Sequence, residues 1–336
     1  MNTVVKSTGL EDKIFTADDG NFTETALAVF RFQYQNNKAY RLFCDTLKKD
    51  VSSIDSIHNI PFLPISLFKT HTITTTDFSP EAIFESSGTT QTLNSKHLVK
   101  DIAVYEKSFT KAFQLFYGDP SGWCIIALLP SYLERKNSSL VMMADKLITQ
   151  SIHPKSGFYL NELYQLQQVL LELEKKEQKT LLIGVTFALL DFAEQYPIPL
   201  KNTVIMETGG MKGRRQEMTR QQVHEVLTTA FRKENIHSEY GMTELLSQAY
   251  SKGNGIFNCP PWMKILIRDE DDPFAIHTKN DKLFISGAIN VIDLANIYSC
   301  SFIATEDAGK LYADGSFEVL GRLDNTDIRG CSLLVL

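Results

Sequence analysis

The sequence has few of the features that mark secreted, membrane-spanning or zinc-binding proteins. It contains only five cysteines in 336 residues, and their scattered positions match neither a disulfide framework nor the paired spacing of a zinc site. Its longest strongly apolar run, residues 123–129, is much shorter than the roughly 20 residues that a spanning helix requires. The first 15 residues lack the apolar segment of a secretory signal. We therefore expect reduced thiols, no membrane span and a cytoplasmic location.

An excess of positive charge is also missing. Lysine and arginine number 34 against 40 aspartates and glutamates, so the formal charge of −6 offers no general electrostatic reason to bind nucleic acid. The chain shows no internal repeat and no low-complexity linker. With 43% hydrophobic and 22% charged residues, the composition is that of an ordinary globular protein. At about 150 residues per domain, the length allows one large or two medium domains.

Apolar periodicity predicts the order of the secondary structure elements. Two amphipathic helices are expected near the N-terminus, at residues 23–35 and 39–47. Buried strands are then predicted at 123–129, 180–185 and 203–206, and helices at 139–150, 161–175, 187–196 and 219–231. The last helix begins with Thr219 and Gln222 at the spacing of a capping box. Strands that alternate with helices predict an α/β fold with a mainly parallel sheet and helices on its faces.

Short apolar runs separated by glycine and aspartate replace this pattern after residue 258. They predict antiparallel strands at 263–267, 282–286, 301–304, 310–312 and 317–320, with turns at 307–309 and 314–315. We therefore expect four regions along the chain. They are a helical N-terminal region 1–75, an α/β core 76–258, a β-rich subdomain 259–320 and a hinge-like tail 321–336.

A cluster of small hydroxyl residues around one glycine follows Glu85. It consists of Ser86, Ser87, Gly88, Thr89 and Thr90. Such a loop can bind phosphate, because its backbone N–H groups and hydroxyls donate hydrogen bonds and glycine allows close approach. It is not a Walker loop, since no Gly-Lys-Ser/Thr follows. Taken alone, the cluster is more typical of a surface turn.

Two further motifs are Tyr240-Gly241-Met242-Thr243-Glu244 and Gly321-Arg322-Leu323-Asp324. In this order, the three segments resemble the signatures of the adenylate-forming superfamily, which includes acyl-CoA synthetases, luciferase-like enzymes and nonribosomal adenylation domains. Shorter stretches narrow the resemblance to the acyl-protein synthetases of the bacterial fatty-acid reductase system that feeds bioluminescence. These stretches are Pro61-Phe62-Leu63-Pro64-Ile65, Phe68-Lys69, Ser95, His97, Asp101, Tyr105 and the ending Arg329-Gly330-Cys331. The resemblance extends from about residue 60 to the C-terminus.

The resemblance implies a binding site for ATP and Mg²⁺, in which residues 86–90 would hold the β- and γ-phosphates. Further nucleotide contacts would come from Gly209, Gly210, Tyr240, Gly241, Thr243, Asp307 and Arg322. In the superfamily, the tyrosine stacks on adenine, the threonine contacts phosphate, the aspartate accepts hydrogen bonds from the ribose hydroxyls, and the arginine supports the ribose or a phosphate. The two glycines line the adenine and acyl pocket, and Glu244 would bind Mg²⁺. We expect Gly88, Glu244 and Asp307 to line one cleft.

The chain departs from the superfamily pattern in three places. Gln91-Thr92-Leu93-Asn94 replaces the usual Gly, Pro and Lys of the phosphate loop, so a phosphate contact of Lys96 stays open. Glu306 replaces the glycine that usually precedes Asp307. Only twelve residues follow Asp324, so the mobile C-terminal domain, with the lysine that usually contacts the α-phosphate, would be absent. The acyl-protein synthetases share this early ending.

Cys331 stands where the acyl-protein synthetases have the cysteine that accepts the acyl group. From the residues alone, one cysteine before an apolar tail is more typical of packing. The leading hypothesis is an AMP-forming ligase that converts a fatty or other carboxylic acid to acyl-AMP and passes the acyl group to Cys331 as a thioester. A reductase or an acyl carrier protein would receive it. The alternatives are a phenylacetate-type acyl-CoA ligase and a noncatalytic nucleotide-binding or scaffold partner of a reductase.

Overall fold

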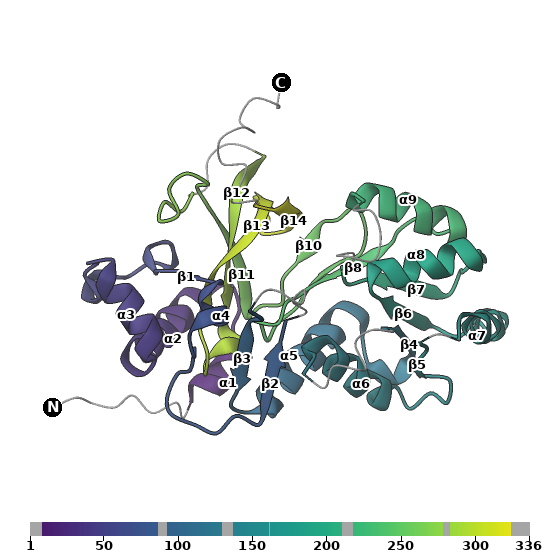
Figure 1. The fold of residues 1–336 in the computed structure, drawn as a ribbon, viewed down its shortest axis with the longest axis horizontal. Coiled ribbons are helices and arrows are strands. Elements are labelled where there is room, and N and C mark those ends of the chain that lie inside the picture. The colour runs from purple at the N-terminus through teal and green to yellow at the C-terminus, as the bar shows by residue number, and fades with distance from the viewer. Residues whose placement is uncertain are drawn as a thin grey trace. The chain divides into compact units, whose positions relative to one another are not determined.

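The computed structural model describes residues 9–86, 93–129, 137–160, 162–209, 218–277 and 283–323. These residues belong to two compact units. The central unit lies within Phe84–Ser87 and Ile102–Asn258, and the terminal unit lies within Met1–Ile83, Gly88–Asp101 and Cys259–Leu336. In Figure 1 the elements from α5 to β10 belong to the central unit.

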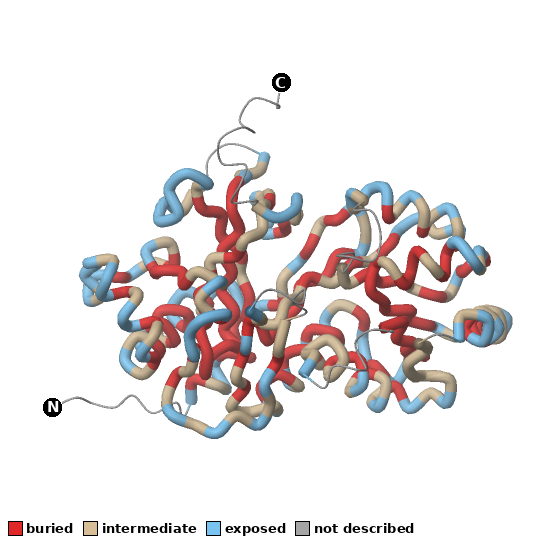
Figure 2. The backbone as a smooth tube through the Cα atoms, in the orientation of Figure 1, coloured by how far each residue is buried: buried red, intermediate tan, exposed pale blue. Residues whose placement is uncertain are grey.

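The central unit is built on a parallel sheet with the strand order β5-β4-β6-β7-β8. The strands are β4 (Cys124–Leu128), β5 (Gly157–Phe158), β6 (Thr180–Gly184), β7 (Thr203–Glu207) and β8 (His237–Tyr240). Every residue of β4 and β6 is buried (Figure 2), as expected for parallel strands that are covered on both faces. Two antiparallel strands extend this sheet: β9 (Ala249–Ser251) pairs with β8, and β10 (Phe257–Asn258) pairs with β9.

Helices cover both faces of the central sheet. They are α5 (Ile102–Tyr117), α6 (Ser139–Ser151), α7 (Leu163–Lys175), α8 (Thr186–Gln195) and α9 (Arg220–Phe231). In Figure 1, α8 and α9 lie side by side on one face, and α5 and α6 lie on the other. The α9 helix begins with the predicted capping box, in which the Thr219 side chain accepts from the Gln222 N–H and the Gln222 side chain accepts from the Thr219 N–H. This cap satisfies backbone N–H groups that an uncapped helix leaves without partners.

The terminal unit contains an antiparallel sheet with the strand order β11-β12-β13-β14. The strands are β11 (Met263–Arg268), β12 (Phe284–Asp293), β13 (Phe302–Tyr312) and β14 (Phe317–Arg322), and the short β1 (Leu63–Pro64) pairs in parallel with β13. Its helices are α1 (Leu10–Ile14), α2 (Phe22–Asn36), α3 (Lys38–Thr46) and α4 (Leu67–Thr70). A two-stranded sheet is formed by β2 (Ala82–Glu85) and β3 (Lys96–Val99).

Side chains from α2 and α3 pack directly against the β13 strand. The rings of Phe30 and Tyr40 lie 6.0 and 6.2 Å from that of Phe302. The Gln33 amide, which is fully buried, donates hydrogen bonds to the Asn296 carbonyl and the Ser301 hydroxyl. The N-terminal helices therefore share a core with the C-terminal sheet.

Most of the elements predicted from periodicity are confirmed, including the two N-terminal helices and the seven strands and helices between residues 123 and 231. The prediction of separate strands at 301–304 and 310–312 is wrong. Both belong to β13, and the predicted turn at 307–309 is a bulged part of that strand. The strand predicted at 282–286 continues to Asp293. The helix α5 was not predicted, although its buried Tyr105, Phe109 and Phe113 recur at the helical spacing.

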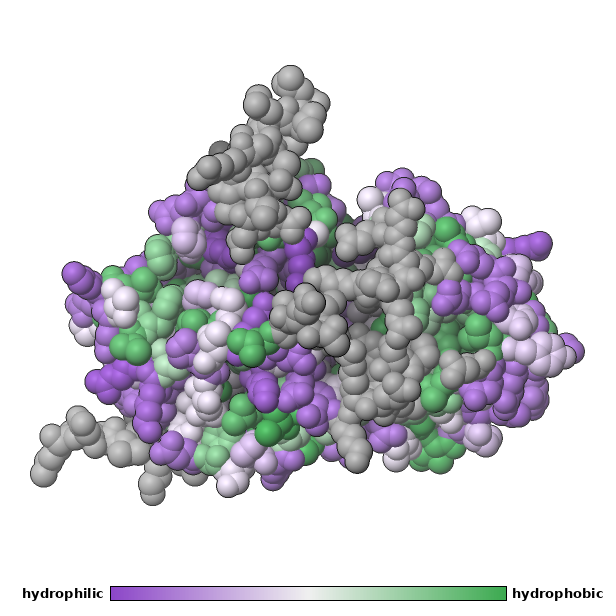
Figure 3. All heavy atoms as spheres, viewed as in Figure 1, coloured by the Kyte–Doolittle hydropathy of each residue, from purple (hydrophilic) through white to green (hydrophobic). Residues whose placement is uncertain are grey.

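Solvent-exposed apolar side chains are scattered in the structure. Large ones such as Leu42, Tyr164 and Leu283 come from different parts of the chain, and the face seen in Figure 3 mixes hydrophilic and hydrophobic residues. Within the described ranges, no helix combines the length and the apolar content needed to cross a membrane. The four cysteines that the structure describes, Cys44, Cys124, Cys259 and Cys300, are free thiols in it.

Candidate functional site

The Tyr240–Glu244 motif leaves the sheet at the carboxyl end of β8, where open α/β sheets bind their ligands. Tyr240 is the last residue of β8, and its ring lies 6.0 Å from that of Phe257. Thr243 is partly exposed, whereas Glu244 retains only 6% of its accessible surface. The motif therefore presents an aromatic ring, a hydroxyl and a buried carboxylate in one short segment at this edge.

Close packing explains why the second residue of this motif is glycine. A Cβ on Gly241 would overlap Glu239 Oε1 and would lie 3.4 Å from Gln248 Cγ. Any larger residue would therefore have to displace the Glu239 carboxylate or the backbone. Gly241 lets the chain leave β8 directly beside that carboxylate.

The neighbouring strand β7 ends at a second carboxylate, which organises the segment leading into the Gly209-Gly210 pair. Glu207 is 7% exposed and accepts hydrogen bonds from the Gly209 N–H at 2.9 Å and the Thr186 hydroxyl at 3.1 Å. The Gly209 carbonyl in turn accepts from the Thr186 N–H at 2.9 Å. Gly209 has a φ of +72°, a left-handed conformation that favours glycine. Both the N–H and the carbonyl of Gly209 are thus hydrogen-bonded.

Cationic and polar groups from α9 and β8 surround the Glu207 carboxylate. His224 Nε2 lies 3.7 Å and Arg220 Nε lies 4.0 Å from Glu207 Oε1. Burial alone would raise the pKa of Glu207, but this effect is outweighed and the pKa falls to about 2. The groups that lower it are His224, Ser238, the Gly209 N–H and Arg220. Glu207 is therefore ionised throughout the neutral range.

Glu239 has the opposite character. It lies directly opposite Tyr250 in the β8–β9 ladder. Burial and the nearby charge of Glu207 raise its pKa to about 8. The two carboxyl groups at the ends of β7 and β8 thus differ in charge near neutral pH. Glu207 has hydrogen-bond donors and cations around it, whereas Glu239 is buried and has a like charge nearby.

The start of the hydroxyl-rich loop is anchored within the central unit. Phe84 is buried with its ring 5.3 Å from that of Tyr105, and the Glu85 N–H donates to the Asn137 carbonyl at 2.9 Å. Ser86 follows as the last described residue before the loop. Of the other predicted site residues, Ser87, Gly88, Thr89, Thr90, Gly210 and Cys331 lie outside the described ranges.

Asp307 and Arg322 belong to the terminal unit, where they face each other across the β13–β14 ladder. Asp307 is partly buried and Arg322 is exposed. The Leu323 N–H donates to the Glu306 carbonyl at 2.8 Å, which joins the end of β14 to the same stretch of β13. The structure therefore brings these two predicted residues together. The common cleft for Gly88, Glu244 and Asp307 stays a prediction.

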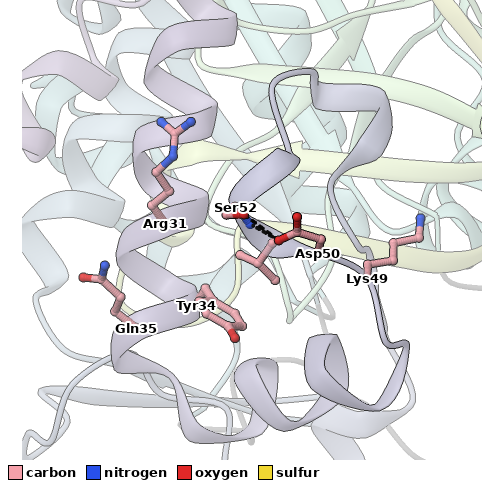
Figure 4. A pocket seen from close by; sticks show the side chains of 7 residues that line it. Arg31, Tyr34, Gln35, Lys49, Asp50 and Ser52 are labelled. Atoms are coloured by element: carbon pink, nitrogen blue, oxygen red, sulfur yellow. Dashed lines mark hydrogen bonds between the residues drawn. The ribbon is translucent and has the colours of Figure 1, made fainter.

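A separate hollow in the terminal unit has a volume of about 510 Å³ (Figure 4). Its lining residues are Arg31, Tyr34, Gln35, Lys49, Asp50, Val51 and Ser52. Asp50 caps the short 3₁₀ helix η1 (Val51–Ser53) by accepting from the Ser52 N–H at 3.0 Å and the Ser52 hydroxyl at 2.6 Å. The polar groups of Asp50 and Ser52 are thus used in holding this turn, and none of the predicted site residues lines the hollow.

Glu244 fits a Mg²⁺ ion that is shared with nucleotide phosphates better than it fits a metal ion that is held by protein ligands alone. Mg²⁺ sites on nucleotides often use one or two carboxylates, and the substrate phosphates supply further oxygen ligands. In the part of the chain that the structure describes, no three His, Cys, Asp or Glu side chains are grouped to hold a metal ion. The buried Glu244 carboxylate, which directly follows the Thr243 hydroxyl in the chain, fits such an arrangement with few protein ligands.

Sequence reasoning missed Glu207, Glu239 and a buried arginine, Arg268, that lies next to Asp307. A signal was present for Glu207, because a carboxylate at the end of a predicted strand and just before two glycines is well placed to bind their N–H groups. No comparable local signal identified Arg268, whose partners come from other strands.

Solved structures of similar fold include adenylate-forming enzymes. ATP-bound MatB from Rhodopseudomonas palustris is 13% identical, with a TM-score of 0.54 over 83% of this chain and 52% of that chain. The 2-hydroxyisobutyryl-CoA ligase in complex with R3-HIB-AMP is 10% identical, with a TM-score of 0.64 over 93% of this chain and 70% of that chain. The chain thus spans about half the length of MatB. These similarities confirm the predicted fold class.

The structural similarities establish the fold, whereas the sequence identifies the family. No curated protein sequence matches the chain. The model of the family described as acyl-protein synthetase, LuxE, matches residues 11–336, which include the serine loop, the Tyr240–Glu244 motif and Cys331. The predicted resemblance is therefore confirmed, and the chain belongs to the LuxE acyl-protein synthetase family.

Proposed function

We propose that this chain is an AMP-forming ligase that activates a carboxylic acid with ATP and then carries the acyl group on its own Cys331. The observation that carries the proposal is the Tyr240–Glu244 motif at the carboxyl end of β8, in a chain of the acyl-protein synthetase family. In the first step a carboxylate oxygen of the substrate attacks the α-phosphorus of ATP. The bond between that phosphorus and the bridging oxygen to the β-phosphate breaks, which yields acyl-AMP and pyrophosphate.

The central unit supplies most of the proposed nucleotide contacts. Tyr240 offers an aromatic surface to adenine, and Thr243 offers a hydroxyl to phosphate. Ser86 and the loop after it bind the β- and γ-phosphates. The Gly209-Gly210 segment lines the adenine and acyl pocket, and Glu207 supports it by accepting from the Gly209 N–H.

Glu244 would hold Mg²⁺ together with the phosphates of ATP. When bound, Mg²⁺ offsets the negative charge of the triphosphate and the charge that develops as pyrophosphate leaves. The low exposure of Glu244 means that its carboxylate needs compensation by positive charge or hydrogen bonds. Its substitution should therefore affect the adenylation step directly.

In the second step the Cys331 thiolate attacks the carbonyl carbon of acyl-AMP. The bond between that carbon and the phosphate oxygen breaks, AMP leaves, and the thiol proton is lost to solvent. The resulting thioester keeps the acyl group activated for a further transfer. We propose an acyl reductase or an acyl carrier protein as the recipient and a fatty acid as the substrate.

Two of the fold neighbours hold species of the first step. MatB binds ATP in its structure, and the 2-hydroxyisobutyryl-CoA ligase holds an acyl adenylate. These ligands belong to those proteins, and the low identities establish a shared fold alone. They support the proposal because membership of the acyl-protein synthetase family independently favours an AMP-forming ligase.

Two assays on the purified chain test the two steps separately. Carboxylate-dependent exchange of pyrophosphate into ATP reports acyl-AMP formation, and intact-protein mass spectrometry with a panel of carboxylic acids reports acylation. We expect exchange and a hydroxylamine-labile mass increase that identifies the acyl group. Acyl-CoA formation on addition of CoA, without protein acylation, would favour a CoA ligase instead. ATP binding without exchange for any acid would favour a noncatalytic partner.

A further inference from the structure

A buried cation holds together three strands of the terminal unit. Arg268, the last residue of β11, retains 8% of its accessible surface. Its Nη1 donates to the Ile289 carbonyl at 2.8 Å and to Asn290 Oδ1 at 2.7 Å. Its Nη2 donates to the Thr305 carbonyl at 2.6 Å. One guanidinium thus joins β11 to β12 and β13 by short hydrogen bonds, which suit its planar array of donors.

These contacts fall where the β12–β13 ladder is interrupted. Ala288 pairs with Ala308, and Asn290 pairs with Ala304. Ile289 is thus the one β12 residue between these pairs, whereas β13 has residues 305–307 between them. Residues 305–307 therefore form a bulge that has no regular pairing with β12, and its last residue, Asp307, pairs only with Arg322 of β14 on the other side.

Arg268 and Thr305 replace the missing ladder contacts in this bulge. The Thr305 hydroxyl donates to the Ile289 carbonyl at 2.8 Å and accepts from the Asp307 N–H at 3.2 Å. Arg268 binds the same Ile289 carbonyl and also the Thr305 carbonyl. The backbone at Asp307 is thus tied through Thr305 to Arg268.

The environment of Arg268 also links it electrostatically to Asp307. Burial lowers the pKa of Arg268, and the negative charge of Asp307 opposes that effect. The Asn290 amide nitrogen has no hydrogen-bond partner within the described residues, so the contact with Arg268 sets the orientation of this amide. The site is therefore arranged around the arginine, and both of its terminal nitrogens are used inside the protein.

We propose that Arg268 is a positioning residue for the ribose of ATP: it holds the 305–307 bulge so that the Asp307 carboxylate accepts hydrogen bonds from the ribose hydroxyls. This inference rests on the proposed function, because that function makes Asp307 the ribose-binding residue. Arg268 acts through Thr305 and Asp307 and does not contact the nucleotide. Its loss should therefore weaken the recognition of the ribose hydroxyls in particular.

Equilibrium binding of ATP and of 2′-deoxy-ATP and 3′-deoxy-ATP, measured by calorimetry, isolates this effect from catalysis. We expect the wild type to prefer ATP over both analogues, and Asp307→Asn to lose the preference. Arg268→Met should raise the Kd for ATP about 10- to 100-fold, the equivalent of hydrogen bonds to a charged group. Its Kd for the deoxy analogues should change much less. The double variant should show no further loss of preference.

Lys264→Met is the matched control, because it removes another cation from β11. Lys264 is partly buried, pairs with the exposed Asp19 at 3.2 Å and lies 4.7 Å from the centre of the Phe22 ring. None of these contacts involves the 305–307 bulge, so the loss of Lys264 should leave the preference unchanged. A folded Arg268→Met variant that keeps the wild-type preference for ATP would overturn the inference. If that variant does not fold, Arg268→Lys is measured instead, since it keeps the charge but not the fork of donors, and an unchanged preference there would also overturn it.

The proposed function can fail independently of this inference. A wild type that prefers ATP over the deoxy analogues but catalyses no exchange would contradict the ligase proposal, while the binding test of Arg268 would still be decisive. A wild type that binds all three nucleotides equally would overturn the role of Arg268, because no ribose hydroxyl would then be recognised.

Discussion

Replacing Glu207 with glutamine tests how the end of β7 is held in place. Glutamine keeps the size of the side chain and one oxygen that can accept from the Gly209 N–H and the Thr186 hydroxyl. It removes the negative charge beside Arg220 and His224. The substitution therefore isolates the contribution of the charge with little change in packing.

The pKa of Glu207 determines how much unfolding free energy the variant should lose. Its ordinary pKa is 4.5, and the folded protein lowers it to about 2, a difference that corresponds to about 3 kcal/mol of unfolding free energy at pH 7. Because the folded pKa is the lower one, this stabilisation is present above pH 4.5 and is lost as the pH falls toward 2. The variant should thus be less stable than the wild type by about 3 kcal/mol at pH 7. At pH 3.5 this loss of stability should be smaller by about 1 kcal/mol.

Urea unfolding at pH 7 and pH 3.5 measures both differences, with Glu225→Gln as the control. Glu225 lies on the exposed face of α9, and its side chain accepts a surface hydrogen bond from Gln221, so its replacement by glutamine should change stability by less than about 0.5 kcal/mol. In the exchange assay, Glu207→Gln should also raise the KM for ATP, since Gly209 loses a charged acceptor. Equal stability of the two variants at pH 7 would refute the reasoning.

Three further substitutions test the proposed chemistry. Glu244→Gln should lower carboxylate-dependent exchange by about two to three orders of magnitude without unfolding the protein, and unchanged exchange would remove Glu244 from the site. Cys331→Ser should preserve exchange but abolish hydroxylamine-labile acylation, because a hydroxyl is a much poorer nucleophile than a thiolate; acylation at wild-type stoichiometry would argue against this cysteine. Gly241→Ala should destabilise the protein by up to about 1 kcal/mol in thermal unfolding, since its Cβ overlaps Glu239 Oε1, the end of a side chain that has to rotate away. The control Gly122→Ala meets open space, and an equal effect of both alanines would contradict the packing argument.

The sequence predicted the elements whose signals are local. The strands of the central sheet are runs of apolar residues, and α9 begins with a hydroxyl and an amide at the capping spacing. The Tyr240–Glu244 motif was found because its residues are adjacent in the chain. In each case the residues that identify the element or motif lie within a few positions of one another, so the sequence alone reveals it.

The β13 bulge shows where such reasoning fails. Asp307-Ala308-Gly309 has the composition of a turn, and a turn was predicted there. The segment instead stays in a strand, because Ala308 and Gly309 pair with β12 and all three residues pair with β14. Arg268 binds the neighbouring Thr305 carbonyl from 37 positions away in the chain. Local composition cannot reveal a hydrogen bond between distant strands. The same limit applies to the hydrogen bond between Glu207 and Thr186, which lies 21 positions earlier, although the bond from the Gly209 N–H is local.

The two carboxyl groups at the ends of β7 and β8 bear on how the proposed site would accept an anionic nucleotide. If both were ionised, a triphosphate would meet two negative charges beside the Gly209 and Tyr240 segments. Glu207 keeps its charge because Arg220, His224 and backbone donors surround it. Burial, together with that charge, favours the neutral form of Glu239. The contacts that keep Glu207 ionised therefore help to keep Glu239 neutral. The edge that would receive ATP then carries one negative charge that is already paired with α9, which reduces the repulsion on the incoming phosphates.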